Sequence, residues 1–202
     1  DAKGNIKKTE VKDAQGTLVS TATQVFNKLG QLESTLGGEG QIQGFTYDDL
    51  GNLKTSNLIA DNAQPDNKQN TQYFYDALER QEKIIDAKEG ETLFSFDDRD
   101  NLKTVTDPNG NITFYHYDGF DNAIKKNSPD TGISIYTFDE ANNVKTQLDN
   151  KQQLTQLEYD VLNRVTDITY QDGQTEHYDY DQGAFAKGRL SQITSNTFNG
   201  NI

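Results

Sequence analysis

Short segments along the chain alternate large and polar side chains with a period of two. In residues 92–96 and 113–117, a threonine and two aromatic residues occupy every second position. Side chains alternate between the two faces of a β-strand, so each segment is predicted to be a strand with the threonine and both rings on one face. β-Branched and aromatic residues also suit a pleated surface. The positions between the rings are mostly polar and predict a face in solvent; examples are Ser95, His116, Thr137 and Glu158.

The strand pattern belongs to a tandem repeat. An aromatic residue followed by Asp or Asn, here called the anchor pair, recurs at Phe26-Asn27, Tyr47-Asp48, Tyr75-Asp76, Phe96-Asp97, Tyr117-Asp118, Phe138-Asp139, Tyr159-Asp160 and Tyr180-Asp181. Six of the seven intervals between anchors are 21 residues, and the interval from Tyr47 to Tyr75 is 28. We interpret residues 61–70 as a loop insertion in that longer interval. A fixed period of this kind predicts a repeat architecture.

Each repeat also carries two turn signals. The Asp of the anchor pair can accept hydrogen bonds from the amides of the turn that follows, and a Gly or Asn can supply the left-handed residue. A second turn signal falls in mid-repeat, as at 107–110 (DPNG) and at Asp172-Gly173. Two turns in 21 residues leave two strands of about six residues, which is one hairpin per repeat. The fold class is therefore all-β, with tandem hairpins forming a curved antiparallel sheet over residues 1–202; a parallel β-helix is the alternative.

The aromatic residues at the anchor and two positions before it form a predicted ladder on one face. The ladder residues with a predicted structural role are Tyr47, Tyr75, Phe94, Phe96, Tyr115, Tyr117, Tyr136, Phe138, Tyr159, Tyr178 and Tyr180. A single repeat has too few apolar residues to offset the conformational entropy of ordering it, so stability must come from neighbouring repeats. We expect the rings to be core, buried between neighbours. Exposed rings would instead form a platform for sugars.

Composition narrows the choice of partners. The chain has a net charge of −13, with 20 aromatic residues (10 Tyr, 10 Phe), no Cys and no Trp. The aromatic content argues against disorder, and an acidic surface repels nucleic-acid phosphates and anionic lipids. No apolar stretch approaches the length of a membrane span, and the absence of Cys excludes disulfides and thiolate metal sites. Because the chain begins at Asp1, without Met or a signal peptide, we expect it to be a segment of a longer protein.

No combination of residues stands out as a catalytic, cofactor or metal site. His116 and His177 are three repeats apart, so a shared site is not expected. The acidic groups Asp48-Asp49 and Asp97, Asp98 and Asp100 lack the spacing of an EF-hand and are interpreted as turns. The glycine-rich segment 37–40 (GGEG) has no following Lys, which argues against a phosphate-binding loop.

The repeat resembles the YD-repeat, or Rhs-repeat, family over essentially the whole chain. The resemblance lies in the eight anchor pairs at their 21-residue step and in the Gly or Asn, then Arg or Asn, that follow them. The family includes Rhs polymorphic toxins, insecticidal toxin-complex shells, wall-associated repeat proteins and teneurins. It implies a long antiparallel sheet that spirals into a hollow shell, which encloses a toxin or folds around its own interior. The 107–110 segment resembles the self-cleavage motif of such shells, but its position is that of an ordinary mid-repeat turn.

These observations predict a non-catalytic structural segment of a secreted or bacterial cell-surface protein. Its expected partners are other repeats of the same parent chain and an enclosed toxin domain, without nucleic acid, membrane insertion or cofactor. The alternative is a cell-surface module for adhesion or carbohydrate binding, with an enzyme ranked far below both.

Overall fold

The computed structural model describes residues 3–38, 40–59 and 68–196, and this part of the chain contains strands and no helix. No segment within it is therefore a helix that could cross a membrane. The strands are β1 (Lys8–Lys12), β2 (Leu18–Phe26), β3 (Leu32–Leu36), β4 (Ile42–Tyr47), β5 (Leu53–Ile59), β6 (Lys68–Tyr75), β7 (Gln81–Ile85), β8 (Glu91–Phe96), β9 (Leu102–Thr106), β10 (Ile112–Tyr117), β11 (Ala123–Ser128), β12 (Gly132–Phe138), β13 (Val144–Leu148), β14 (Leu154–Tyr159), β15 (Val165–Tyr170), β16 (Thr175–Tyr180) and β17 (Leu190–Asn196).

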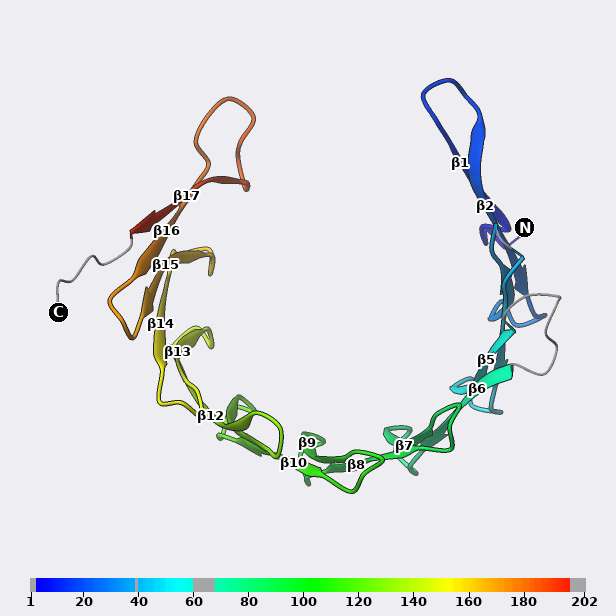
Figure 1. The fold of residues 1–202 in the computed structure, drawn as a ribbon, viewed down its shortest axis with the longest axis horizontal. Coiled ribbons are helices and arrows are strands. Elements are labelled where there is room, and N and C mark those ends of the chain that lie inside the picture. The colour runs from blue at the N-terminus through cyan, green and yellow to red at the C-terminus, as the bar shows by residue number, and fades with distance from the viewer. Residues whose placement is uncertain (1–2, 39, 60–67, 197–202) are drawn as a thin grey trace. The chain divides into compact units, whose positions relative to one another are not determined.

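These seventeen strands of the described chain belong to one open antiparallel sheet. The chain divides into two compact units, one of residues 1–94 and 106–110 and the other of residues 95–105 and 111–202. In the first unit, β1 to β8 pair in chain order. In the second, β10 to β17 do the same (Figure 1). Tandem antiparallel hairpins are therefore confirmed, and the parallel β-helix is excluded.

A β-bulge lies at the anchor of nearly every repeat. Where β10 pairs with β11, His116 faces Lys125 but Tyr117 faces Ala123, so β11 carries one extra residue opposite the anchor. The same shift occurs at Phe26, Tyr47, Tyr75, Phe138, Tyr159 and Tyr180. A bulge bends its strand and increases local twist. The sequence pattern predicted the strands but gave no sign of the bulges.

The turn after the anchor contains a left-handed residue at its fourth position. Gly30 and Gly51 take this conformation in the first two repeats. In later repeats the same position is held by other residue types, namely Glu79, Asp100, Asp121, Asn142 and Asn163, with φ between 59° and 67°. The prediction of Gly or Asn was thus too narrow. Side chains with a Cβ tolerate this backbone at a cost of about 1–2 kcal/mol, which the surrounding hydrogen bonds offset.

The ring face is half-buried rather than buried. All eleven predicted ladder residues lie in strands with intermediate exposure, and no apolar side chain in the described residues is fully buried. The prediction that the rings form a buried core is therefore wrong. The sheet is a single layer, so each ring is covered only by its neighbours along the sheet. The opposite face is exposed, as predicted, but it includes apolar side chains such as Leu93 and Phe114 among its polar ones.

The predicted loop insertion at residues 61–70 is partly corrected. Residues 61–67 lie outside the described part of the chain. Lys68 to Asn70 are not loop but the first residues of β6, and the backbone of Asn70 pairs with that of Asn57 in β5. The two strands of this hairpin have 7 and 8 residues.

Substitution of Glu79 tests the cost of the left-handed turn residue. Glu79→Gly is expected to keep or raise the free energy of unfolding, because Gly adopts positive φ without a Cβ clash. Glu79→Val is expected to lower it by about 1–2 kcal/mol. Urea unfolding followed by circular dichroism measures both. Equal stability of the two variants would contradict the assignment.

Candidate functional site: bonds between neighbouring repeats

The aspartate closes the turn that follows it in six of the eight anchor pairs. Oδ1 of Asp118 accepts hydrogen bonds from the amides of Phe120 (2.8 Å) and Asn122 (3.0 Å). The same two bonds are made by Asp48, Asp76, Asp97, Asp139 and Asp160, and by Asn27 through its amide oxygen. The predicted capping role is therefore confirmed, and these carboxylates are occupied by their own turns.

The residue four positions after this aspartate binds its second oxygen. Asn122 donates from Nδ2 to Oδ2 of Asp118 at 3.1 Å, and this bond lowers the pKa of Asp118. Arg164 donates from Nε to Asp160 at 2.7 Å and forms an ion pair with it at 2.6 Å. These contacts hold the pKa of Asp160 below its usual range. The Asn or Arg of the repeat pattern is thus explained by the turn.

The same Asn and Arg residues also bond to the turn of the next repeat. We call this series of bonds the turn ladder. Nδ2 of Asn101 donates to Oδ1 of Asp121 at 2.7 Å, and Asn143 donates to Asn163 at 3.0 Å. Arg164 pairs with Asp181 at 2.9 Å. The remaining ladder bonds join Asn122 to Asn142 and Gln31 to the carbonyl of Gly51. Residues 17 to 20 positions apart are thereby joined along the edge of each unit.

Anchor tyrosines make a second bond between repeats, here called the tyrosine latch. The hydroxyl of Tyr117 donates to the carbonyl oxygen of Leu102, 15 residues earlier, at 2.8 Å. The same bond is made by Tyr47 to Leu32, Tyr75 to Leu53, Tyr159 to Val144 and Tyr180 to Val165, at 2.8–3.0 Å. Loss of solvent around the ring raises the pKa of Tyr117, so the hydroxyl remains a donor. Phe26, Phe96 and Phe138 have no hydroxyl and cannot form a latch.

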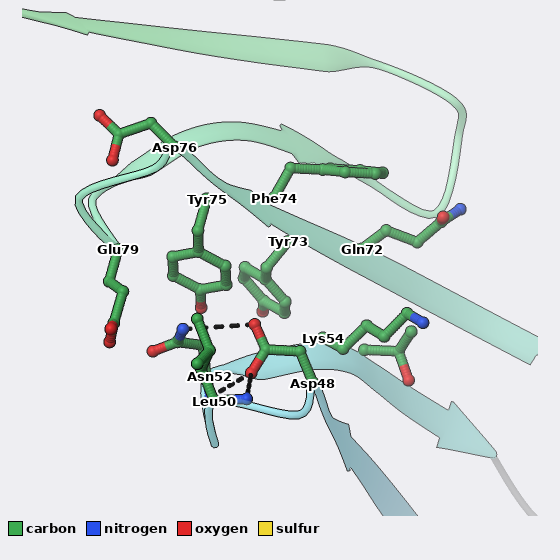
Figure 2. Close-up of a pocket in the computed structure, with 11 residues that line it drawn as sticks. Asp48, Leu50, Asn52, Lys54, Gln72, Tyr73, Phe74, Tyr75, Asp76 and Glu79 are labelled. Carbon is green, nitrogen blue, oxygen red and sulfur yellow. Dashed lines mark hydrogen bonds between the residues drawn. The ribbon is translucent and has the colours of Figure 1, made fainter.

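A shallow hollow of about 260 Å³ lies beside the latch of Tyr75. Figure 2 shows the rings of Tyr73 and Tyr75 side by side above the turn that carries Asp48 and Asn52. This groove occurs where β5 and β6 cease to pair, because their last paired residues are Thr55 and Gln72. The groove is therefore part of the boundary between two neighbouring repeats, which we call the seam, and is not a separate cavity.

Most cross-strand pairs on the opposite face are formed by polar side chains. Hydroxyl pairs join Thr46 to Thr55 (2.7 Å) and Thr137 to Thr146 (2.6 Å). In another repeat the corresponding pair is Phe74 with the Lys83 ammonium, 4.7 Å from the ring centre. Such pairs contribute roughly 0.2–1 kcal/mol each and fix the strand register.

The two histidines lie on this opposite face in different strands. His116 in β10 faces Lys125. His177 in β16 has Nδ1 at 2.7 Å from Oδ1 of Asp167 and Nε2 at 3.5 Å from Asp179. The hydrogen bond with Asp167 raises the pKa of His177. His177 thus belongs to a cross-strand ion pair, a partnership that the sequence did not reveal.

A carboxylate clamp on the ring face was also not predicted. Glu176 accepts hydrogen bonds from the hydroxyls of Tyr170 (3.2 Å) and Tyr178 (2.6 Å). The bond to Glu176 raises the pKa of Tyr178 to about 12. Glu176 and Tyr178 are two residues apart in β16, and the hairpin of β15 and β16 brings Tyr170 to the same face. The period-two alternation along β16 is the local signal that could have indicated the clamp.

The other candidate sites lie in turns. Asp107 accepts the amides of Asn109 and Gly110 in an ordinary mid-repeat turn. Gly37 and Gly40 belong to the turn between β3 and β4. Among the described residues, no group of three or more His, Asp or Glu is arranged to hold a metal ion.

An apolar row follows the turn edge, at the third residue after the anchor. In the first unit Leu29, Leu50 and Leu78 are 82%, 72% and 66% exposed. In the second unit Phe120 and Leu162 take the same position and are also exposed. Single exposed apolar residues are common, but these recur at the same turn position and so form an exposed apolar row.

The fold and the turn chemistry define the chain as an array of β-hairpin repeats, each joined to the next by side-chain bonds. The family model "Teneurin YD-shell" matches residues 1–199, and the chain belongs to this family. No curated protein matches the sequence.

Solved structures of toxin complexes share the fold. The TcdB2-TccC3-Cdc42 structure matches with a TM-score of 0.66 and 16% identity, over 83% of this chain and 10% of that one. TcdB2-TccC3 without its hypervariable C-terminal region matches at 0.57 and 19%, over 90% and 9%. The Photorhabdus luminescens Tc holotoxin pore matches at 0.57 and 18%, over 90% and 9%. The chain thus spans about a tenth of the length of these proteins.

Removal of one hydroxyl tests the tyrosine latch. Tyr117→Phe is expected to lower the free energy of unfolding by about 1 kcal/mol, because the Leu102 carbonyl loses its hydrogen bond. Tyr115→Phe is the matched control, since the structure gives its hydroxyl no hydrogen-bond partner among the described residues. Chemical denaturation compares the two. Equal losses would show that the latch does not contribute.

The turn aspartates predict acid sensitivity. The pKa values of Asp48, Asp76, Asp97, Asp118, Asp139 and Asp160 all lie below the ordinary value. Their contribution to stability is present above the unfolded aspartate pKa of about 3.9 and is lost as the pH falls through the folded values. Unfolding in urea at a series of pH values is expected to show a steep loss below about pH 4.

Asp118→Asn provides the control for that acid transition. Asn27 shows that an amide oxygen can accept the same turn bonds, so the cap is retained without a titrating group. The variant should lose less stability than the parent between neutral pH and pH 3. An identical pH profile would assign the acid effect to other groups.

Proposed function

We propose that the chain is a non-catalytic wall segment of a β-shell, in a larger secreted or surface protein that encloses a toxin cargo. The tyrosine latch carries the proposal, because the same bond recurs in five repeats and joins each of them to the one before it. Membership in the Teneurin YD-shell family supports a shell role. The fold shared with toxin complexes supports enclosure of a toxin.

The mechanism is containment by a continuous sheet. Backbone pairing closes the wall within each hairpin and between hairpins, while the latch and the turn ladder fasten the ends where pairing stops. A wall of this type needs no reactive side chain. Its recurring polar groups are engaged in turn caps and cross-repeat bonds, which supports a role without catalysis.

The apolar row at the turn edge also supports a larger assembly. Leu29, Leu50 and Leu78 together place three exposed aliphatic side chains along one edge of the first unit. In a shell, that edge would be covered by a further run of repeats from the same parent chain. Burial of each leucine would contribute roughly 1.5–3 kcal/mol.

Carbohydrate binding is the second candidate, favoured by the half-exposed ring face. In the groove of Figure 2, the rings of Tyr73 and Tyr75 lie beside polar groups of Asp48, Asn52 and Lys54. Flat rings beside amide and carboxylate groups can stack on sugars and bind their hydroxyls. Glycan binding that is lost in Tyr73→Ala with the fold intact would favour this function, whereas unfolding of this variant would favour the wall.

The apolar row provides the direct test of the wall role. The triple substitution of Leu29, Leu50 and Leu78 by Ser is expected to leave the circular dichroism spectrum unchanged, because the three side chains contact solvent. It should reduce concentration-dependent self-association of the chain in sedimentation velocity and abolish closure of the shell in the parent protein. Leu93→Ser, on the opposite face, is the control. A normally closed shell with the triple substitution would contradict the proposed role of this edge.

A further inference from the structure

The seam between β11 and β12 lacks the latch found at other repeats. Its anchor is Phe138, and the residue 15 positions earlier, where the latch would end, is Ala123. The five latches instead join a tyrosine to Leu or Val, 15 positions earlier in four repeats and 22 positions earlier at Tyr75. Compared with the latched seams, the Phe138 seam therefore lacks the tyrosine hydroxyl and has a methyl group in place of a larger aliphatic side chain.

Two adjoining hollows lie at this seam. One has a volume of about 290 Å³ and the other about 770 Å³, and both are lined by Lys125, Tyr136 and Phe138. The hollow beside the latched Tyr75 measures about 260 Å³. Backbone pairing of β11 with β12 ends at Lys125 and Ile135, before the anchor is reached. Pairing of β5 with β6 also ends three residues before its anchor, at Gln72. The larger hollow is therefore what distinguishes the Phe138 seam, and it leaves room for a side chain that the repeat itself does not supply.

Rings and a positive charge surround the smaller hollow. Lys126 faces Tyr115 across one strand pair and Ser134 across the other, so it shares the ring face with Tyr136. Lys125 and Lys126 line the hollow together with these rings, and no carboxylate does. This is unusual in a chain with a net charge of −13. The larger hollow has Asp118, Asp139 and Glu140 at its turn end, so the positive charge is confined to the side nearer Tyr115.

We propose that the Phe138 seam binds a peptide segment in which an aromatic side chain stands next to a carboxylate. The ring occupies the space between Tyr136 and Phe138, and a tyrosine hydroxyl donates to the carbonyl of Ala123 in place of the missing latch. The neighbouring carboxylate pairs with Lys126. The proposal rests on the proposed function only for the source of the peptide, which is the enclosed chain.

The lining of the smaller hollow favours a peptide over an anionic sugar. Its side chains are two tyrosines, a phenylalanine, an alanine, a valine and two lysines. A sugar needs a hydrogen-bond partner for most of its hydroxyls, and this surface offers few. A single ring with one acidic neighbour needs an apolar slot and one cation, as in the aromatic anchors of protein interfaces.

The test is an NMR titration of the isotope-labelled chain with a short synthetic peptide that has a central Tyr between two Asp residues. Chemical-shift changes are expected at Tyr115, Ala123, Lys126 and Phe138. Peptides with Ala in place of Tyr, or with Lys in place of Asp, are expected to bind at least about tenfold more weakly.

Two variants of the protein separate the parts of the site. Phe138→Tyr supplies the missing hydroxyl to Ala123, so it should raise the unfolding midpoint and weaken peptide binding by about tenfold or more. Lys126→Gln should weaken binding and remove most of its salt dependence, whereas Lys145→Gln should leave both unchanged.

Three outcomes would overturn the proposal. The first is that chemical-shift changes lie away from the seam or are absent at millimolar peptide. The second is that the Phe138→Tyr variant is more stable but binds the peptide as tightly as the parent chain. The third is that the chain binds a glucuronate oligosaccharide more tightly than the peptide. None of these would affect the wall role, which is tested by the apolar row. A failure of shell closure would likewise leave the peptide titration valid.

Discussion

A sheet of one layer has no second layer to pack against, so each hairpin must be stabilised by contacts with the neighbouring hairpins of the same sheet. This constraint applies along the whole described chain. The described residues contain no fully buried apolar side chain, so no central core offsets the entropy lost on folding. Each hairpin instead depends on the hairpins beside it, through backbone pairing and through partly covered rings. The contacts are nearest-neighbour contacts, as in other repeat proteins. Their energies are individually small, so they must recur at every step.

The bulge at each anchor explains why these side-chain bonds lie where they do. The residue that pairs with one anchor across the bulge supplies the carbonyl for the next latch: Leu53 pairs with Tyr47 and accepts the hydroxyl of Tyr75. At Tyr117 the ring spans the gap and its hydroxyl reaches the Leu102 carbonyl. Bulge, tyrosine and turn aspartate are therefore parts of one device that closes the end of a hairpin.

Much of this fold could be predicted from the sequence because its signals are local and repeated. Alternation around Phe94 and Phe96 gave a strand, and the aspartate after each anchor gave a turn whose amide bonds the structure confirms. The latch could not be predicted, because it joins residues 15 positions apart through a register that includes a bulge. The clamp at Glu176 lies within one hairpin, so the alternation along β16 could have indicated it. The rings were expected to be buried because burial is the usual role of such residues, but a sheet without a second layer leaves them half-exposed.

The residue type at the anchor varies between Tyr and Phe from repeat to repeat, and this variation changes the bonds between repeats although the fold stays the same. A tyrosine at the anchor closes its seam by one hydrogen bond, whereas a phenylalanine at the same position keeps the ring and cannot make that bond. The backbone is fixed by turns and pairing on both sides, so such a change does not require the hairpin to rearrange. Repeats that are equivalent in fold can therefore differ in surface, through as little as one oxygen atom. At Phe138 that difference coincides with a small alanine and with two lysines, which turns a structural seam into a recess with its own chemistry.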